Sequence, residues 1–181
     1  MSLSCTDHLI QEHRLILRSV YVLQAMADQA RAGKMPADED VAKLLDFLKR
    51  FADDHHQGKE EAVLFPCLRE ASEGPSNALR MMMFEHEQER SLVGGLEDAL
   101  RTHKNEDFAY YGGRLAEILS THIYKEDNIL FSLVERTISK EVDARVAREM
   151  VAYDESLPAA KREEMNRVVN DLEWKYLGKA A

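Results

Sequence analysis

The sequence predicts an all-α protein, an antiparallel up-down four-helix bundle with extra C-terminal helices. Only 8 Gly and 4 Pro occur among 181 residues, and aromatic residues make up 7%, a composition that favours helices over sheets. Apolar residues recur at helical spacing along four long segments, and no segment shows the alternation of a β-strand. The length fits one domain with a substantial hydrophobic core.

The first two helices follow from apolar stripes and their end signals. Apolar residues from Leu9 to Ala27 define the first helix, which Gly33 and Pro36 bring to an end. Asp38 or Asp40 can cap the second helix, whose stripe runs over residues 41–67. The proline at position 66 is expected to kink or loosen its last turns.

The next two helices are separated by turn-forming segments. EGPSN at 73–77 predicts a break, and the third helix then carries apolar residues over 79–100. THKNED at 102–107 predicts a turn before a fourth helix, whose stripe runs over 111–133. Two further helices are expected after Ser139, the second with Ser156 as its cap and Pro158 in its first turn.

These elements predict two parts of the chain. Residues 1–136 form the bundle, and residues 137–181 form a C-terminal helical extension that packs on the bundle or on a partner subunit. If the extension packs on a partner subunit, the protein would form a homodimer.

Charge and composition exclude several classes of partner. The net charge of −9 argues against a nucleic-acid surface, which needs a basic stripe. No apolar run approaches the roughly 20 residues of a membrane span. The first residues, MSLSCTDHLIQEHR, lack the pattern of a secretory signal. Two cysteines are too few for a disulfide framework, so we expect reduced thiols and a cytoplasmic location.

An internal repeat places polar residues in an apolar setting. HQGKEEAVLF at 56–65 matches HIYKEDNILF at 122–131, and Glu12-His13 parallels Glu85-His86. Residues 7–72 and 79–136 therefore indicate two similar helical hairpins. Short connections favour antiparallel neighbours, so the hairpins are expected to close into one bundle.

Six of these polar residues lie on the apolar stripes and are expected to point into the bundle: His13, His56, Glu60, His86, His122 and Glu126. Burying them unpaired would cost several kcal/mol. Mutual His–Glu pairs in a metal-free core would satisfy some of them, whereas a metal site satisfies all of them. Two carboxylates that can bridge, with about two histidines per metal, indicate a dinuclear centre.

As a set, EHRLIL at 12–17, HQGKEEAVLFP at 56–66, EHEQER at 85–90 and HIYKEDNILF at 122–131 resemble the hemerythrin-like, or HHE cation-binding, domain family. The resemblance covers residues 7–136. It implies a non-haem di-iron centre with two oxo-bridged iron ions on the six residues above. It also implies a protein that binds or reacts with O2, peroxide or NO, as a sensor or in an oxidative-stress response. The alternative is an iron sensor or buffer without catalysis.

The third helix departs from the pattern of the oxygen-carrying hemerythrins, which have HxxxH there. This chain has His86 followed by Arg90, which resembles a bacterial subgroup with the pattern H, HxxxE, HxxxR, HxxxE. An inward guanidinium would bind peroxide or another anion beside the centre through charge-assisted hydrogen bonds. The other interpretation of Arg90 is a surface residue.

Neighbouring residues leave further alternatives. Asp127 has the HxxxxD spacing of the oxygen carriers, but Glu126 matches Glu60 in the repeat and lies nearer the His122 stripe of a regular helix. Glu61 poses the same question on the second helix. Lys59 is a poor core residue, so we expect His55, on a neighbouring stripe, at the margin of the site or in solvent.

Overall fold

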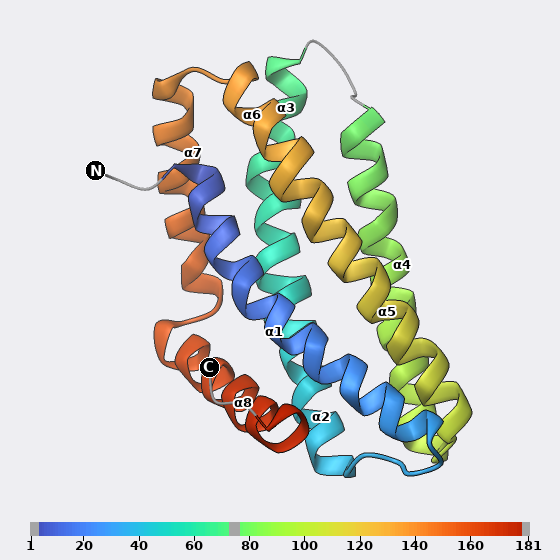
Figure 1. The fold of residues 1–181 in the computed structure, drawn as a ribbon. Coiled ribbons are helices and arrows are strands. Elements are labelled where there is room, and N and C mark those ends of the chain that lie inside the picture. Colours follow the sequence, from blue (N-terminus) through green and yellow to red (C-terminus); the bar gives the residue numbers. More distant parts are fainter. Residues whose placement is uncertain (1–3, 73–76, 179–181) are drawn as a thin grey trace.

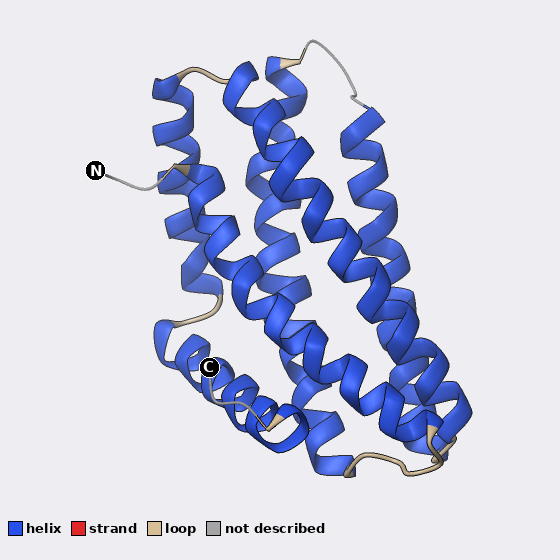
Figure 2. Cartoon of the chain, viewed as in Figure 1, coloured by secondary structure: helices blue, strands red, loops and turns tan. Residues whose placement is uncertain are grey.

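Four helical rods lie side by side in a computed structural model that describes residues 4–72 and 77–178 (Figure 1). Every regular element in these two ranges is a helix (Figure 2). The predicted all-α bundle is therefore confirmed. None of the described helices combines the length and the apolar character that a membrane crossing needs.

The rods follow one another in chain order. The first is α1 (Cys5–Arg31), and the third is α4 (Asn77–Thr102). The second rod joins α2 (Asp38–Phe47), η1 (Leu48–Gln57), η2 (Glu60–Leu64) and α3 (Phe65–Ala71), and the fourth joins α5 (Asn105–Lys125), η3 (Glu126–Leu130) and α6 (Phe131–Thr137). The segments η1, η2 and η3 are π-helical, so their backbone bonds span five residues instead of four.

Some end signals act as expected and others do not. Gly33, at φ +85°, follows α1 in a backbone region that favours glycine. The second rod has Ala37 at its N-cap without a side-chain hydrogen bond, so the capping predicted for Asp38 or Asp40 was wrong. Both carboxylates lie inside the first turn instead, where the helix dipole favours negative charge. Most of the predicted break at 73–77 lies outside the described residues.

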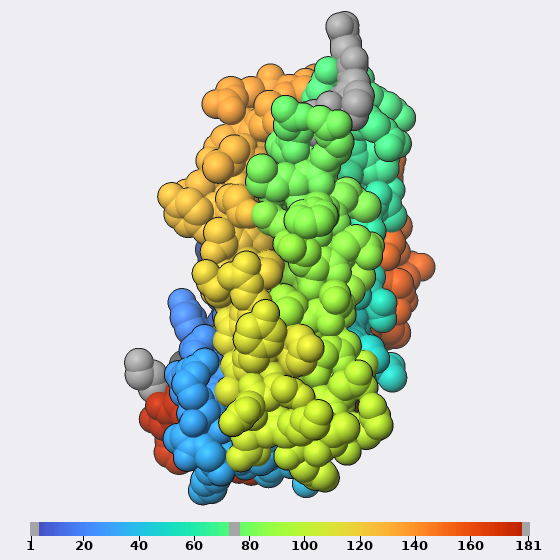
Figure 3. Space-filling view, turned by 90° about the vertical axis from the view of Figure 1, so that its right-hand side faces the viewer, coloured from blue at the N-terminus to red at the C-terminus, as the bar shows by residue number. Residues whose placement is uncertain are grey.

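The extension forms α7 (Lys140–Tyr153), a short 3₁₀ turn η4 (Asp154–Ser156) and α8 (Ala159–Leu177). Ser156 belongs to that turn and Pro158 is the N-cap of α8, so the predicted Ser156 cap was wrong. Both long helices pack on α1, and α8 also reaches α2 (Figure 1). The opposite face, formed by α4 and α5, is the one seen in Figure 3. Contact with a partner subunit stays a prediction.

A polar layer divides the apolar core into two clusters. On α1, Leu9 belongs to one cluster and Ile16 to the other, with His13 between them. The second rod repeats this order with Ala52 in one cluster and Leu64 in the other. The candidate site therefore lies midway along the bundle, sealed by apolar side chains at both ends.

Candidate metal centre

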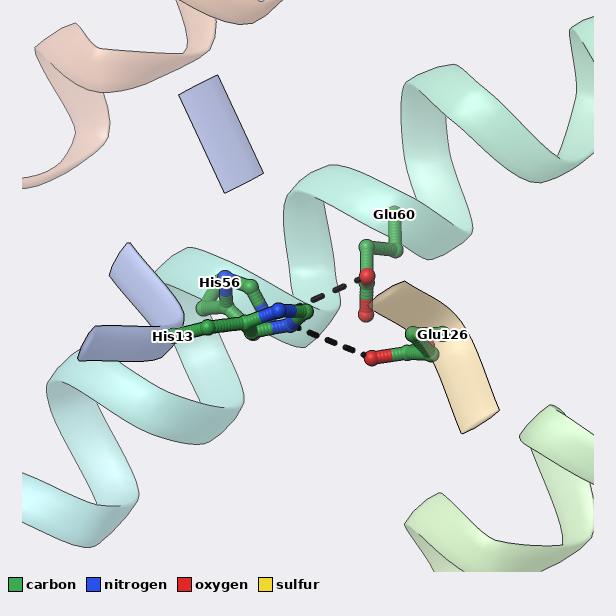
Figure 4. Close-up of side chains that lie close together, drawn as sticks. All are labelled: His13, His56, Glu60 and Glu126. Carbon is green, nitrogen blue, oxygen red and sulfur yellow. Dashed lines mark ion pairs between the residues drawn. The ribbon is translucent and has the colours of Figure 1, made fainter. Parts of the chain in front are cut away.

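The structure brings the six predicted site residues together in the polar layer. His13, His56, Glu60 and Glu126 form one group, and Glu60, His86, His122 and Glu126 form the other. Within each group one ligand atom per residue lies within 4.8 Å of all the others. Every member is at most 3% exposed. Figure 4 shows the first group, with the histidines facing the two carboxylates.

Each carboxylate faces one histidine from each half of the bundle. Glu60 Oε1 lies 3.8 Å from His56 Nε2, and Glu60 Oε2 lies 3.5 Å from His86 Nε2. Glu126 Oε2 lies 3.2 Å from His13 Nε2, and Glu126 Oε1 lies 3.3 Å from His122 Nε2. The two oxygens of each carboxylate face different histidine groups, so Glu60 and Glu126 both lie between the two groups.

Neighbouring acidic residues take different places in the two π-helical turns η2 and η3. Both η2 and η3 begin at the central glutamate, Glu60 in one and Glu126 in the other. The next residue in each rod, Glu61 or Asp127, turns to the outer side of a histidine from another rod. Asp127 Oδ1 lies 2.7 Å from His13 Nδ1, and Glu61 Oε1 lies 2.7 Å from His86 Nδ1. The sequence predicted regular α-helices and not these π-helical turns, which are frequent at functional sites.

The remaining two histidines have equivalent outer partners. Glu12 Oε2 lies 2.8 Å from His56 Nδ1, and Glu85 Oε2 lies 3.0 Å from His122 Nδ1. All four histidines thus contact a carboxylate through Nδ1 and turn Nε2 to the centre. A carboxylate partner fixes the ring orientation and places the proton on Nδ1, which leaves the Nε2 lone pair for a metal.

Charges within the layer shift the pKa values in opposite directions. Burial, together with the nearby charge of Glu126, raises the pKa of Glu60 well above its ordinary value. Burial also acts to raise the pKa of Glu126, but the charges of His122 and His13, which lie within ion-pair distance of its oxygens, hold it well below its ordinary value. Burial, helped by repulsion from His13, lowers the pKa of His56 to about 4. Without a metal, the layer therefore divides into one ionised and one neutral carboxylate.

The donor set fits a pair of metal ions. His13 Nε2 and all four oxygens of Glu60 and Glu126 are buried without a hydrogen-bond partner among the described residues. His86 Nε2 and His122 Nε2 face each other at 3.1 Å, where two lone pairs would repel unless a cation or proton lies between them. Imidazole and carboxylate suit iron, manganese or zinc.

A sequence model of the hemerythrin HHE cation-binding domain family matches residues 5–134. The chain belongs to this family. Searches among curated proteins and among solved structures found no match. The family resemblance predicted from the sequence is therefore confirmed, while the assignment to the HxxxR subgroup stays a prediction.

One half of the HHE domain has an added buried cluster. Lys59 is 1% exposed, and its ammonium lies 2.5 Å from Glu12 Oε1 and 2.6 Å from Asp154 Oδ1. His55, also 1% exposed, lies 3.3 Å from Glu12 and 3.4 Å from Asp154. The expectation that Lys59 would not be a core residue was wrong. His55, expected at the margin of the site or in solvent, lies buried at the margin, in contact with the Glu12 that holds His56. The reason is Asp154, which comes from the C-terminal extension and covers both side chains.

Gly58 makes room for this cover. A Cβ atom at Gly58 would lie 2.4 Å from the Tyr153 hydroxyl. That hydroxyl donates to the Asp54 carbonyl at 3.1 Å. The extension therefore approaches the second rod at a position, between His56 and Glu60, where a Cβ atom would force the Tyr153 side chain to shift. In the other half, the matching Lys125 pairs with Glu85 and is 23% exposed.

Arg90 lies on the outer side of the site. Its guanidinium donates to Asp53, Glu61 and Glu87, each at 2.8 Å, and is 29% exposed. Arg90 is connected to His86 through Glu61, which contacts both side chains. Anion binding by Arg90 stays a prediction. Glu89, the residue before it, was not singled out from the sequence, yet it is 4% exposed. Its inward direction follows from its place one turn beyond His86, a signal that the spacing already contained.

Proposed function

We propose that this HHE domain is a non-haem di-iron protein that binds or reacts with O2, peroxide or NO. The supporting observation is a pair of fully buried carboxylates, Glu60 and Glu126. Each of them faces one histidine of the first group and one of the second. His13 and His56 would hold one ion, and His86 and His122 the other. Both glutamates would bridge.

Iron is the metal that this donor set and family favour. The four neutral imidazoles and two carboxylates would offset only part of the charge of two iron ions, so the centre would stay positive and favour an anionic or polarisable small ligand. Bundle cores with inward glutamates and histidines are a common setting for di-iron carboxylate sites. Two iron ions held here would supply open coordination positions and electrons for a small ligand.

The protein's own residues orient the donors and exclude water. Glu12, Glu61, Glu85 and Asp127 hold the four imidazole rings through Nδ1. Phe131 stacks on His13 at 5.6 Å between ring centroids, and Phe65 stacks on His86 at 5.8 Å. The aromatic rings lie against the histidines on the side of one apolar cluster, so they restrict ring rotation and the entry of water.

Metal analysis of the purified full chain tests the proposal. We expect about two iron atoms per chain and an optical spectrum that changes between anaerobic and aerated samples. Added azide, peroxide or NO is expected to change that spectrum further. A protein that folds fully with no bound metal would instead have the metal-free His–Glu core considered from the sequence. Bound iron with no response to any of the four ligands would favour an iron sensor or buffer.

A further inference from the structure

A surface groove lies between the second rod and α4, next to the metal centre. Its volume is about 520 Å³. Residues about one helical turn apart line it on both sides, namely Glu61, Phe65 and Arg69 on the second rod and Leu79 and Met83 on α4. The groove therefore runs along the two rods. His86 follows Met83 by three residues, so the inner end of the groove lies at the second group of converging ligand atoms.

Phe65 lies between this groove and His86. Phe65 is 5% exposed, and its ring stacks on the His86 imidazole with 5.8 Å between the ring centroids and 18° between the ring planes. At the same end of the groove, Glu61 Oε1 lies 2.7 Å from His86 Nδ1. A single phenyl ring therefore contacts both the groove and an imidazole of the proposed ligand set.

The internal repeat supplies a matched residue on the other side of the centre. Phe131 corresponds to Phe65 in the repeat, and its ring stacks on His13 with 5.6 Å between the centroids. Both rings belong to the same apolar cluster, but Phe131 is 1% exposed and does not line the groove. The outer carboxylates do not distinguish the two sides, because Glu61 and Asp127 are 24% and 31% exposed. The difference between the sides lies in the surroundings of two matched phenyl rings.

The groove offers a route for a neutral diatomic molecule. Phe65, Leu79 and Met83 give it apolar surface, on which a molecule such as O2 or NO needs no hydrogen-bond partner. Apolar cavities in proteins take up small apolar species such as xenon. Arg69 and Arg80 also line the groove at exposed positions, and their charges do not oppose the entry of an uncharged molecule.

We propose that O2 or NO enters the site through this groove and that Phe65 sets the rate of entry. The inference rests on the proposed function and names the residue that admits its ligand. Because a packed interior leaves few voids, a diatomic molecule passes from the groove to the imidazole layer only when the Phe65 ring moves. Phe65 is therefore assigned control of access and is not a metal ligand. A smaller side chain at this position would speed entry, and an obstacle in the groove would slow it.

Binding of NO to the iron-loaded, reduced protein measures the rate of entry. Stopped-flow mixing under anaerobic conditions follows the optical change for the wild type, Phe65→Leu and Phe131→Leu. Both variants replace a phenyl ring on a histidine by the same smaller side chain. We expect Phe65→Leu to raise the association rate constant about five- to tenfold, because binding no longer waits for a ring movement, and Phe131→Leu to change it by less than about twofold.

Met83→Trp tests the groove without a change in the core. Met83 is 39% exposed, so an indole there is expected to lie over the groove and to slow NO association about threefold or more. Met81→Trp is the matched control, because Met81 is 49% exposed on the same helix and does not line the groove. Its association rate is expected to equal that of the wild type. This pair also decides the matter if Phe65→Leu does not fold.

Dissolved O2 tests the route without iron. In the zinc-loaded chain with isotope-labelled phenylalanine rings, the paramagnetism of O2 speeds the NMR relaxation of nearby nuclei. We expect a larger effect at Phe65 than at Phe131, and we expect Met83→Trp, but not Met81→Trp, to reduce it.

Three results would each overturn the proposal: equal effects of the two leucine substitutions on NO association, equal effects of the two tryptophan substitutions, or equal relaxation of the two rings. Iron content is measured in parallel. A chain that binds no iron refutes the proposed function, and the O2 measurement on the zinc-loaded chain still decides the route.

Discussion

Arg90 and His86 share one carboxylate oxygen. Glu61 Oε1 lies 2.7 Å from His86 Nδ1 and 2.8 Å from Arg90 Nη2. The pKa of Glu61 is lowered to about 2. The hydrogen bond with His86 is the largest cause, and the hydrogen bond from Arg90 adds to it. Arg90 also holds Asp53 and Glu87, so each nitrogen of its guanidinium donates to a carboxylate. Its position favours orienting His86 through Glu61.

We expect Arg90→Ala to lower the stability of the protein by about 1 kcal/mol, because Glu61 and Asp53 lose their cation in a partly exposed setting. Arg90→Lys is expected to recover part of that loss, since an ammonium cannot reach all three carboxylates. Thermal unfolding measures both. Azide affinity, followed optically, is expected to stay the same. A loss of about tenfold would support the anion-binding role that the sequence suggested.

Removal of an inner histidine tests the ligand set. His56→Ala and His122→Ala each delete one imidazole from a different group of converging atoms. We expect each variant to lose about one iron or more per chain in elemental analysis. His103→Ala is the control, because that side chain is 66% exposed and far from the layer in the chain. Equal iron content in the three variants would refute the assigned site.

Asp154 connects the C-terminal extension to the same site. It pairs with Lys59 at 2.6 Å and with Arg162 at 2.7 Å, and Lys59 in turn binds Glu12, the partner of His56. Asp154→Asn leaves a buried ammonium with one carboxylate fewer, so we expect a stability loss of about 1–3 kcal/mol. Iron held by His13 and His56 is expected to dissociate faster in chelator competition.

Gly58→Ala perturbs the same contact without removing a charge. The added methyl group meets the Tyr153 hydroxyl, so it is expected to displace η4 and Asp154 and to reproduce the faster release. Gly94→Ala, where a Cβ meets open space, is the control. If neither Asp154→Asn nor Gly58→Ala changes iron release, the extension has no part in holding the centre.

The repeat made much of the fold and the six inner residues predictable from sequence. Polar residues that recur on apolar stripes, as at His56 and His122, can be aligned by helical periodicity alone. The outer carboxylates Glu12 and Glu85 were visible as repeat partners, but their bonds to histidines depend on contacts between rods. Such contacts are not encoded in the period of one helix.

Two other features required the structure. The π-helical turns that begin at Glu60 and Glu126 are specified by no residue type, and the contacts of Glu61 and Asp127 with histidines of other rods could not be read from one helix. Burial of Lys59 depends on Asp154, which lies 95 residues later in the chain. Long-range ion pairs of this kind override the preference of lysine for the surface.

Metal removal is expected to destabilise the protein. Glu60 and Glu126 are fully buried, and their oxygens have no hydrogen-bond partner among the described residues. Iron at about 100 times its Kd would stabilise the fold by about 3 kcal/mol, which corresponds to roughly 6–12 °C in Tm. Thermal melts with and without chelator measure this, and hydrogen exchange is expected to increase first in η2 and η3. Identical melts would argue against coupling between metal and fold.

The last prediction concerns the pH dependence of Glu89 in the metal-free protein. Burial raises the pKa of Glu89 from its model-peptide value of 4.5 to about 7. Between these two values the folded chain binds more protons than the unfolded chain, so stability falls as pH rises through the window. Glu89→Gln keeps the shape and removes the charge. We expect the variant to be about 1–3 kcal/mol more stable than the wild type at pH 8 and nearly equal to it at pH 5. Glu155→Gln, at an exposed position of η4, is expected to show no such difference between the two pH values. Urea unfolding at both pH values decides the matter, because a stabilisation of Glu89→Gln that is equal at pH 5 and pH 8 would mean that the Glu89 carboxylate is not held neutral by burial.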